Sequence, residues 1–186
     1  MTMLRAFVAI ASTLVVLLLL AGYLLPGELY VERTLTVQAE PEAVYSLVNS
    51  GEGWGQWTSW IKEFDPSWKG NILDGPTEGV GMRYKWQTNK LGGGVITITV
   101  SEAPKHVAYT MRQLPSEQEL QGQFRVEAVA EGGCRVSWSE GTTIEGSIGR
   151  WMALASKGRI ATNMDKTLGR LRDLAETPGN VRAPSK

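Results

Sequence analysis

The chain has 186 residues, 42% of them hydrophobic and 20% charged, which suits one packed domain of about 150 residues with a short appendage. Basic and acidic residues balance at 19 each, and no basic stripe interleaved with aromatic residues is present, which argues against nucleic-acid binding. Cys134 is the only cysteine, so an intramolecular disulfide and a thiolate metal site are both excluded. Its alternation with Val136 and Trp138 predicts a small, buried apolar side chain.

The N-terminal segment contains an uncharged, mostly apolar run of 20 residues, from Ala6 to Leu25. This is about the length that a helix needs to cross a bilayer, so we predict a transmembrane anchor in residues 1–27. A cleaved signal peptide is the alternative, although residues 21–26 offer no small-residue cleavage site. Arg5 precedes the run, and the positive-inside rule then predicts a single-pass protein of the cytoplasmic (inner) membrane with its C-terminal domain in the periplasm.

The residues after Pro26 predict a strand and then two short helices. Alternating apolar residues indicate a strand over residues 31–37, and Glu40-Pro41-Glu42 is typical of a helix start. Trp54, Trp57 and Trp60 follow with a spacing of three, so on a short helix they share one surface. They either line a pocket mouth, contact a membrane surface, or fill the open end of a sheet as core.

Residues from Gly79 onward predict five antiparallel strands joined by turns at Gly92, Pro104, Pro115 and Gly132. Antiparallel neighbours have a constant sum of residue numbers, so inward side chains of successive strands are expected opposite one another. The predicted pairs are Tyr84–Ile98, Ile98–Tyr109, Tyr109–Val126 and Val126–Val136. The meander therefore builds one continuous apolar face.

The same rule, applied to the first and last strands, pairs Leu35 with Trp138 and places Arg33 opposite Glu140. A charge on the inward face needs a partner, because stranding one there is costly. Arg33 and Glu140 are therefore expected either to form a structural ion pair near the sheet edge or to anchor the polar end of a ligand.

A long final helix is predicted from near Ser147 to near Thr177, with Met164, Leu168 and Leu171 at helical spacing. The Thr-Pro-Gly sequence at 177–179 ends the helix, and residues 178–186 are predicted to be a disordered tail.

Several stretches of the chain are similar to a known family. They are residues 33–37 and 39–45, Trp57 to Trp60 with Asp65-Pro66, residues 79–86, and residues 92–98 with Pro104. Over roughly residues 29–176 the chain resembles the SRPBCC (START-like) superfamily, in particular its polyketide cyclase/dehydrase-like branch. The resemblance implies an α+β helix-grip fold for residues 28–177, in which a curved antiparallel sheet wraps around the long C-terminal helix.

The resemblance also implies a cavity between sheet and helix, which family members use for lipids, sterols or polyketides. It brings no universal catalytic motif and no cofactor, and the sequence offers no metal-binding pattern. His106, the only histidine, is expected at the surface. The candidate cavity residues are Arg33, Leu35, Trp57, Trp60, Tyr84, Trp86, Ile98, Tyr109, Met111, Phe124, Val126, Val136, Trp138, Glu140, Met164 and Leu168.

Three functions remain open at this point. The favoured one is a membrane-anchored binding or transfer module for a hydrophobic small molecule or lipid. The second is a cyclase or dehydratase-like enzyme, with Tyr84, Tyr109, Arg33 or Glu140 as acid–base candidates. The third is a ligand-free domain that acts through contacts with an unidentified protein partner in the cell envelope.

Overall fold

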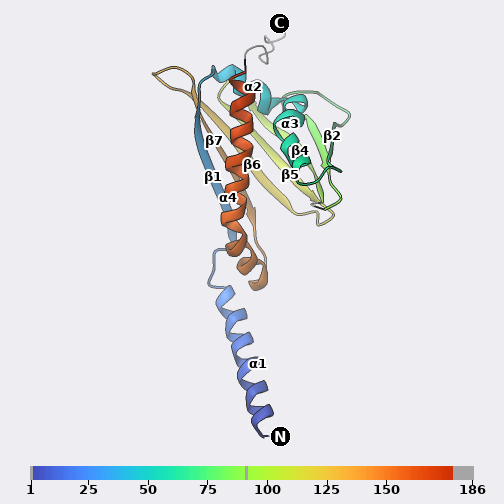
Figure 1. Ribbon diagram of the computed structural model, residues 1–186, viewed down its shortest axis with the longest axis vertical. Coiled ribbons are helices and arrows are strands. Elements are labelled where there is room, and N and C mark those ends of the chain that lie inside the picture. The colour runs from blue at the N-terminus through green and yellow to red at the C-terminus, as the bar shows by residue number, and fades with distance from the viewer. Residues whose placement is uncertain (1, 91, 178–186) are drawn as a thin grey trace.

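The computed structural model describes residues 2–90 and 92–177, apart from the side chains of Thr2 and Trp60 (Figure 1). The predicted tail at 178–186 lies outside the described residues, as does the side chain of Trp60. The helices are α1 (Thr2–Gly22), α2 (Pro41–Asn49), α3 (Gly51–Trp57), the 3-10 helix η1 (Ser59–Glu63) and α4 (Ser147–Ala175). The strands are β1 (Glu28–Val37), β2 (Lys69–Ile72), β3 (Arg83–Gln87), β4 (Gly93–Glu102), β5 (His106–Leu114), β6 (Glu119–Ala128) and β7 (Cys134–Thr143).

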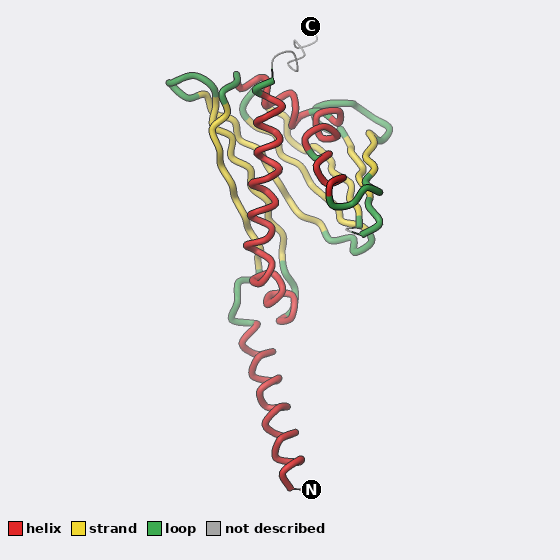
Figure 2. The backbone as a smooth tube through the Cα atoms, in the orientation of Figure 1, coloured by secondary structure: helices red, strands yellow, loops and turns green. Residues whose placement is uncertain are grey.

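The strands form one antiparallel sheet in the order β1-β7-β6-β5-β4-β3-β2, so the first long strand returns to pair with the last one. The helix α4 packs along β1 on one face of this curved sheet, and α2 and α3 cover the rest of that face (Figure 2). This is the predicted helix-grip fold, and the α+β class is confirmed.

Local sequence explains where the short helices begin and end. Pro41 occupies the first turn of α2, where its missing N–H costs nothing, and Glu42 adds an acid near the positive end of the helix dipole. Ser50 separates α2 from α3, and its hydroxyl accepts a hydrogen bond from the Gly53 N–H at 3.2 Å. The extended backbone of Ser50 therefore ends α2, and its side chain caps the start of α3.

The strand registers confirm two predicted pairs and shift two others. Ile98 lies opposite Tyr109, and Val126 lies opposite Val136, as predicted. Tyr84, however, faces Ile96, and Tyr109 faces Gly122. Both shifts are even numbers of residues, so every inward side chain keeps its face.

The turns account for these shifts. The Thr88 N–H donates to the Gly92 carbonyl at 2.7 Å, which closes the β3–β4 hairpin one residue earlier than the sequence suggested. The Gln113 N–H donates to the Gln118 carbonyl at 2.9 Å, which closes the β5–β6 turn two residues earlier than the sequence suggested. Turn centres depend on such local bonds, which the alternation of apolar residues does not specify.

The predicted pairing of Arg33 with Glu140 is wrong. Arg33 lies opposite Trp138, and Val31 lies opposite Glu140, because β1 is displaced by two residues along β7. The Arg33 Nε instead contacts the Asp165 carboxylate on α4 at 3.0 Å, with both side chains substantially exposed. The guanidinium thus stays near water at the helix–sheet rim, where its charge costs little.

The helix α1 extends from the end of the domain at which α4 begins (Figure 1). Residues 3–22 have a mean hydropathy of 2.4, and their apolar side chains are exposed rather than packed. The segment is long and apolar enough to cross a membrane, and a signal sequence has the same character. The predicted division at residue 27 stays a prediction.

Candidate functional site: an apolar pocket beside the start of α4

A pocket of about 420 Å³ lies between the first half of α4 and the inner face of the sheet, near the end of the domain that carries α1. Two groups of residues surround it, one from the ends of β1, β5, β6 and β7 and one from α4 and the segment that precedes it. The lining residues are Leu29, Val31, Gln113, Gln118, Leu120, Glu140, Gly141, Thr142, Ile144, Glu145, Gly149, Met152, Ala153 and Ile160.

The other half of the same inner face is filled by aromatic rings. Trp54 and Trp57 on α3 lie 4.3 Å apart between ring centroids, and both are almost completely buried. Trp57 meets Trp138 edge-on at 5.9 Å, and Phe124 stacks on Trp138 at 5.2 Å. The indole N–H groups of Trp54 and Trp57 donate to the carbonyls of α2, at 2.9 Å and 3.2 Å, so these buried donors are satisfied.

Trp54 and Trp57 are therefore part of the core, which is one of the three alternatives predicted from their spacing. Gly53 makes the close approach possible, because a Cβ there would overlap the backbone of Leu47. Towards α1 the inner face has no aromatic ring among the described residues, and α4 lines it with Gly149 and Ala153 beside Met152 and Ile160. Small side chains on the helix leave space, and the pocket occupies it.

A hydrogen-bonded pair forms the boundary between the filled half and the pocket. The Tyr109 hydroxyl donates to Glu140 Oε1 at 2.5 Å, and the Trp138 indole N–H donates to the Tyr109 oxygen at 2.8 Å. The Tyr109 ring lies directly over Gly122, where any Cβ would overlap it. Glu140 also lines the pocket, so its carboxyl connects the aromatic core to the open space.

Burial sets the electrostatics of this pair. Removal from water raises the pKa of Glu140 above its usual range, although the hydrogen bond from Tyr109 acts in the opposite direction. Burial, together with the nearby Glu140, raises the pKa of Tyr109 well above 10. The Tyr109 hydroxyl therefore keeps its proton, and Glu140 holds a proton more readily than an exposed carboxyl does. The Glu140 carboxyl can therefore form a hydrogen bond with a polar atom of a bound molecule.

The structure distributes the predicted cavity residues over three places. Glu140 lines the pocket. The aromatic residues Trp57, Tyr109, Phe124 and Trp138 form the packed half of the inner face. Arg33 and Leu35 lie on β1 beside α4, and the remaining described positions belong to or pack against the hydrophobic core: Tyr84, Trp86, Ile98, Met111, Val126, Val136, Met164 and Leu168.

Sequence reasoning missed most of the residues that surround the pocket. Val31 lies on the inward face of the strand predicted over residues 31–37, although it was not among the candidate cavity residues. Leu29 and Leu120 continue the inward alternation to the strand ends, so extending that pattern by one or two positions identifies them. Met152 and Ala153 lie on the part of α4 before Met164, which the predicted apolar stripe of Met164, Leu168 and Leu171 does not cover. The pocket residues therefore lie at the ends of the strands and in the first half of the helix, outside the central positions of the predicted elements.

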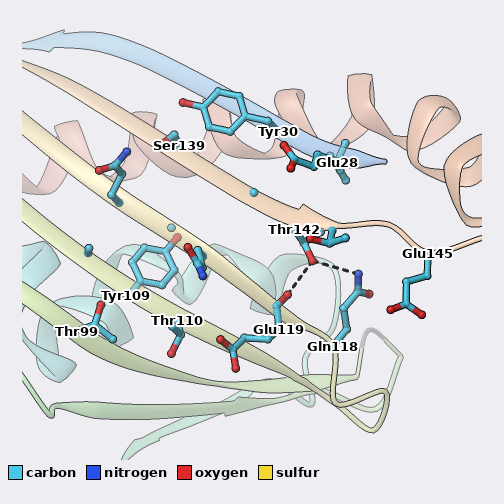
Figure 3. Close-up of a pocket in the computed structure, with 17 residues that line it drawn as sticks. Glu28, Tyr30, Thr99, Tyr109, Thr110, Gln118, Glu119, Ser139, Thr142 and Glu145 are labelled. Atoms are coloured by element: carbon cyan, nitrogen blue, oxygen red, sulfur yellow. Dashed lines mark hydrogen bonds between the residues drawn. The ribbon is translucent and has the colours of Figure 1, made fainter. Parts of the chain in front are cut away.

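A larger, open hollow of about 1010 Å³ lies mainly over the opposite face of the sheet (Figure 3). Most of its lining side chains alternate with the inward ones, among them Thr99, Thr110 and Ser139. The Thr142 hydroxyl donates to the Glu119 carbonyl at 2.7 Å at its edge (Figure 3). A hydroxyl- and amide-rich surface of this kind suits water better than an apolar ligand, so we place the candidate site on the inner face.

The other titratable residues of interest lie away from the pocket. Burial raises the pKa of Tyr84 to about 12, and its hydroxyl lies against Gly70 at the far edge of the sheet. Cys134 is completely buried, and burial is the main cause that raises the pKa of its thiol to about 11. His106 is half-buried between Gln123, at 3.1 Å, and Glu102, at 3.5 Å. Within the described residues, no group of three or more His, Cys, Asp or Glu side chains could hold a metal ion.

Comparison with known proteins agrees with this architecture. A profile of the family described as "Polyketide cyclase / dehydrase and lipid transport" matches residues 29–176. The chain belongs to this family. No curated protein matches the chain.

Solved structures with a similar fold include several that are distant in sequence. A protein from Chromobacterium violaceum has a TM-score of 0.58 and 12% identity, over 80% of this chain and 98% of that one. The Aha1 dimer from Colwellia psychrerythraea has a TM-score of 0.55 and 19% identity, over 81% and 98%. The di-domain ARO/CYC protein StfQ, from the steffimycin biosynthetic pathway, has a TM-score of 0.61 and 14% identity, over 80% of this chain and 51% of that one. At these identities the likeness shows the fold alone.

Proposed function

We propose that this protein is a membrane-anchored module that binds a hydrophobic small molecule, lipid-like or polycyclic, in the pocket beside the start of α4. The observation that carries the proposal is the contrast on the inner face of the sheet. Aromatic rings fill one half, whereas the half beside α1 leaves about 420 Å³ lined by Leu29, Val31, Leu120 and other apolar side chains. The family description, which includes lipid transport, supports the same class of ligand.

The size and lining of the pocket support useful affinity. Ligand pockets commonly measure about 300–1,000 Å³ and combine apolar walls with a few polar groups. Each square ångström of apolar surface removed from water contributes about 25 cal/mol. A pocket that is already open in the unliganded fold avoids the cost of creating that space.

We further propose that Glu140 and Tyr109 hold the polar end of the ligand. The Glu140 carboxyl is the charged or hydrogen-bonding group at the inner wall, and the hydroxyl of Tyr109 fixes its orientation. A hydroxyl, amide or carboxyl group of the ligand then forms a hydrogen bond with the Glu140 carboxyl, which holds its proton more tightly than an exposed carboxyl does. The apolar part of the ligand then lies along Met152 and Ile160 of α4.

The membrane topology is part of the proposal. We take α1 as an uncleaved span of the inner membrane and place the domain on its periplasmic side, because Arg5 precedes the apolar run. Fusion of a periplasm-active reporter to the C-terminus tests this placement, and activity of a cytoplasm-only reporter would contradict it.

Blocking the pocket tests binding directly. The full-length chain, extracted in mild detergent, is examined by native mass spectrometry and by lipid analysis of the denatured sample. We expect a co-purifying apolar mass with the native chain and a severalfold loss with Ala153→Phe, because Ala153 lines the pocket and a phenyl ring occupies it. The matched control is Ala155→Phe, since Ala155 is exposed on the same helix. Equal amounts of bound ligand in both variants would refute the proposed site.

An enzymatic role is the second candidate, and the Tyr109–Glu140 pair is the observation that favours it. A carboxyl whose pKa is raised by burial, next to a hydroxyl in a pocket, can transfer a proton in a cyclisation or dehydration. If a dehydration occurs, Glu140→Gln retains a bound molecule whose mass exceeds that of the native chain's ligand by the one water that the reaction releases. Identical bound masses in the two proteins would argue against dehydration at this site.

A further inference from the structure

The first half of α4 carries large apolar side chains that the fold does not bury. Ile148, Met152 and Leu154 are 64%, 67% and 54% exposed, and Trp151 is 38% exposed. They lie within two turns of a helix whose second half, in contrast, packs its apolar residues into the core. A surface of this kind on a water-soluble domain marks an interaction site.

The position of this surface relative to α1 identifies its partner. The Arg150 guanidinium donates to the carbonyls of Tyr23 and Leu25, at 2.8 Å and 2.9 Å, just beyond the end of α1. The Trp151 indole N–H donates to the Leu18 carbonyl at 3.0 Å, inside the apolar run itself. The start of α4 is therefore attached to the last turn of the candidate span.

The contact between the two helices is close as well as polar. Gly22 lies against Ser147, where any Cβ would overlap the serine hydroxyl. If α1 crosses the bilayer, the carbonyl of Leu18 lies at or below the headgroup level, and Trp151 lies beside it. Tryptophan is one of the side chains enriched at this depth, because its ring is apolar and its N–H is polar.

The charge of the segment fits a lipid surface. Residues 147–160 contain Arg150, Lys157 and Arg159 and no acidic residue, although the whole chain is neutral. Exposed bulky apolar residues next to basic ones are typical of helical segments that lie in the membrane interface. A protein partner would not explain why this basic and apolar segment lies directly against α1, the candidate membrane span.

We infer that residues 147–154 of α4 lie in the interface of the bilayer that α1 crosses, so that the ligand pocket opens onto the membrane rather than onto bulk water. Met152 belongs to both surfaces, because it is exposed and also lines the pocket. A lipid-like ligand then passes between bilayer and pocket along α4 without crossing water. This inference rests on α1 being a membrane span, as in the proposed function.

Fluorescent labelling of single cysteines tests the inference on the full-length chain. Cys134 is replaced by alanine, and Leu154→Cys or Arg172→Cys carries an environment-sensitive dye; the two positions are about 27 Å apart along the helix. In nanodiscs of phosphatidylcholine and phosphatidylglycerol, we expect blue-shifted emission at position 154. We also expect quenching by lipid-borne spin labels that is severalfold stronger there than at position 172.

Three outcomes separate the possibilities. Equal, water-like emission at both positions would overturn the inference. Blue-shifted emission at position 154 without quenching by the lipid spin labels would also overturn it, because protein and not lipid would then cover the surface. Strong lipid quenching with no ligand bound to the native chain would support this inference while contradicting the proposed function, and the mass measurement on the same sample distinguishes the two.

Discussion

The two halves of the inner sheet face differ although the same strands build both. In the half that α3 covers, the rings of Trp57, Phe124 and Trp138 lie 5–6 Å apart between centroids. None of these three residues lines the 420 Å³ pocket. In the half beside α1, the first part of α4 presents Gly149 and Ala153 and a pocket remains. In this chain, the candidate site therefore arises where one part of the sheet–helix interface is left unfilled, while aromatic rings fill the other part.

The largest expected effect lies in the filled half. Trp57→Ala removes a side chain that is 1% exposed and contacts three other rings, so we expect a loss of about 3–5 kcal/mol in the free energy of unfolding. Urea denaturation of the full chain in detergent, followed by circular dichroism, measures it. Met152→Ala in the open half should change the same quantity by within about 0.5 kcal/mol, because that side chain is largely exposed. Similar losses in the two variants would erase the distinction between the halves.

A smaller effect is expected at the boundary between them. Gly122→Ala places a methyl group against the Tyr109 ring, which is enclosed by the core and tied to Glu140, so we expect a loss of about 1–3 kcal/mol. Gly158→Ala is the control, because that glycine lies in α4 with open space around its Cβ position. The control should stabilise the helix by about 0.5–1 kcal/mol, as alanine does relative to glycine. A neutral result for Gly122→Ala would mean that Tyr109 can move away without cost.

Replacing Glu140 is expected to change the free energy of unfolding least at any single pH. Its effect is expected instead in how that free energy varies with pH. Burial raises the folded-state pKa of Glu140 above the value of 4.5 for an exposed carboxyl, so the folded protein binds this proton more tightly than the unfolded chain. The contribution of this tightly bound proton to folding stability is fully present below pH 4.5. It is lost as the pH rises through the folded-state pKa of Glu140.

Glu140→Gln removes this titration and should flatten the decline in stability that begins as the pH rises above 4.5, as measured by urea midpoints. Glu145→Gln is the matched control, since Glu145 also lines the pocket but its side chain is exposed. A native slope that survives in Glu140→Gln would show that other groups cause it.

The candidate site shows how far a sequence pattern reaches. Alternation placed Tyr109, Phe124, Trp138 and Glu140 on one face, and the structure brings them together there. The pattern could not separate a ring that fills space from one that borders a pocket, because both are inward and buried. The pattern also predicted a register for Arg33 that is wrong by two residues. In the structure Glu140 accepts a hydrogen bond from Tyr109, and Arg33 contacts Asp165.

The sequence by itself determined which side chains face inward, the order of the elements and the apolar character of α1, because period and composition are local properties. Only the tertiary structure decided where the sheet–helix interface is filled. That outcome depends on which volumes meet across it: Trp57 of α3 against Trp138 in one half, and Ala153 of α4 beside Val31 and Leu29 in the other. These residues are far apart along the chain, and no sequence pattern shows which side-chain volumes will meet across the interface.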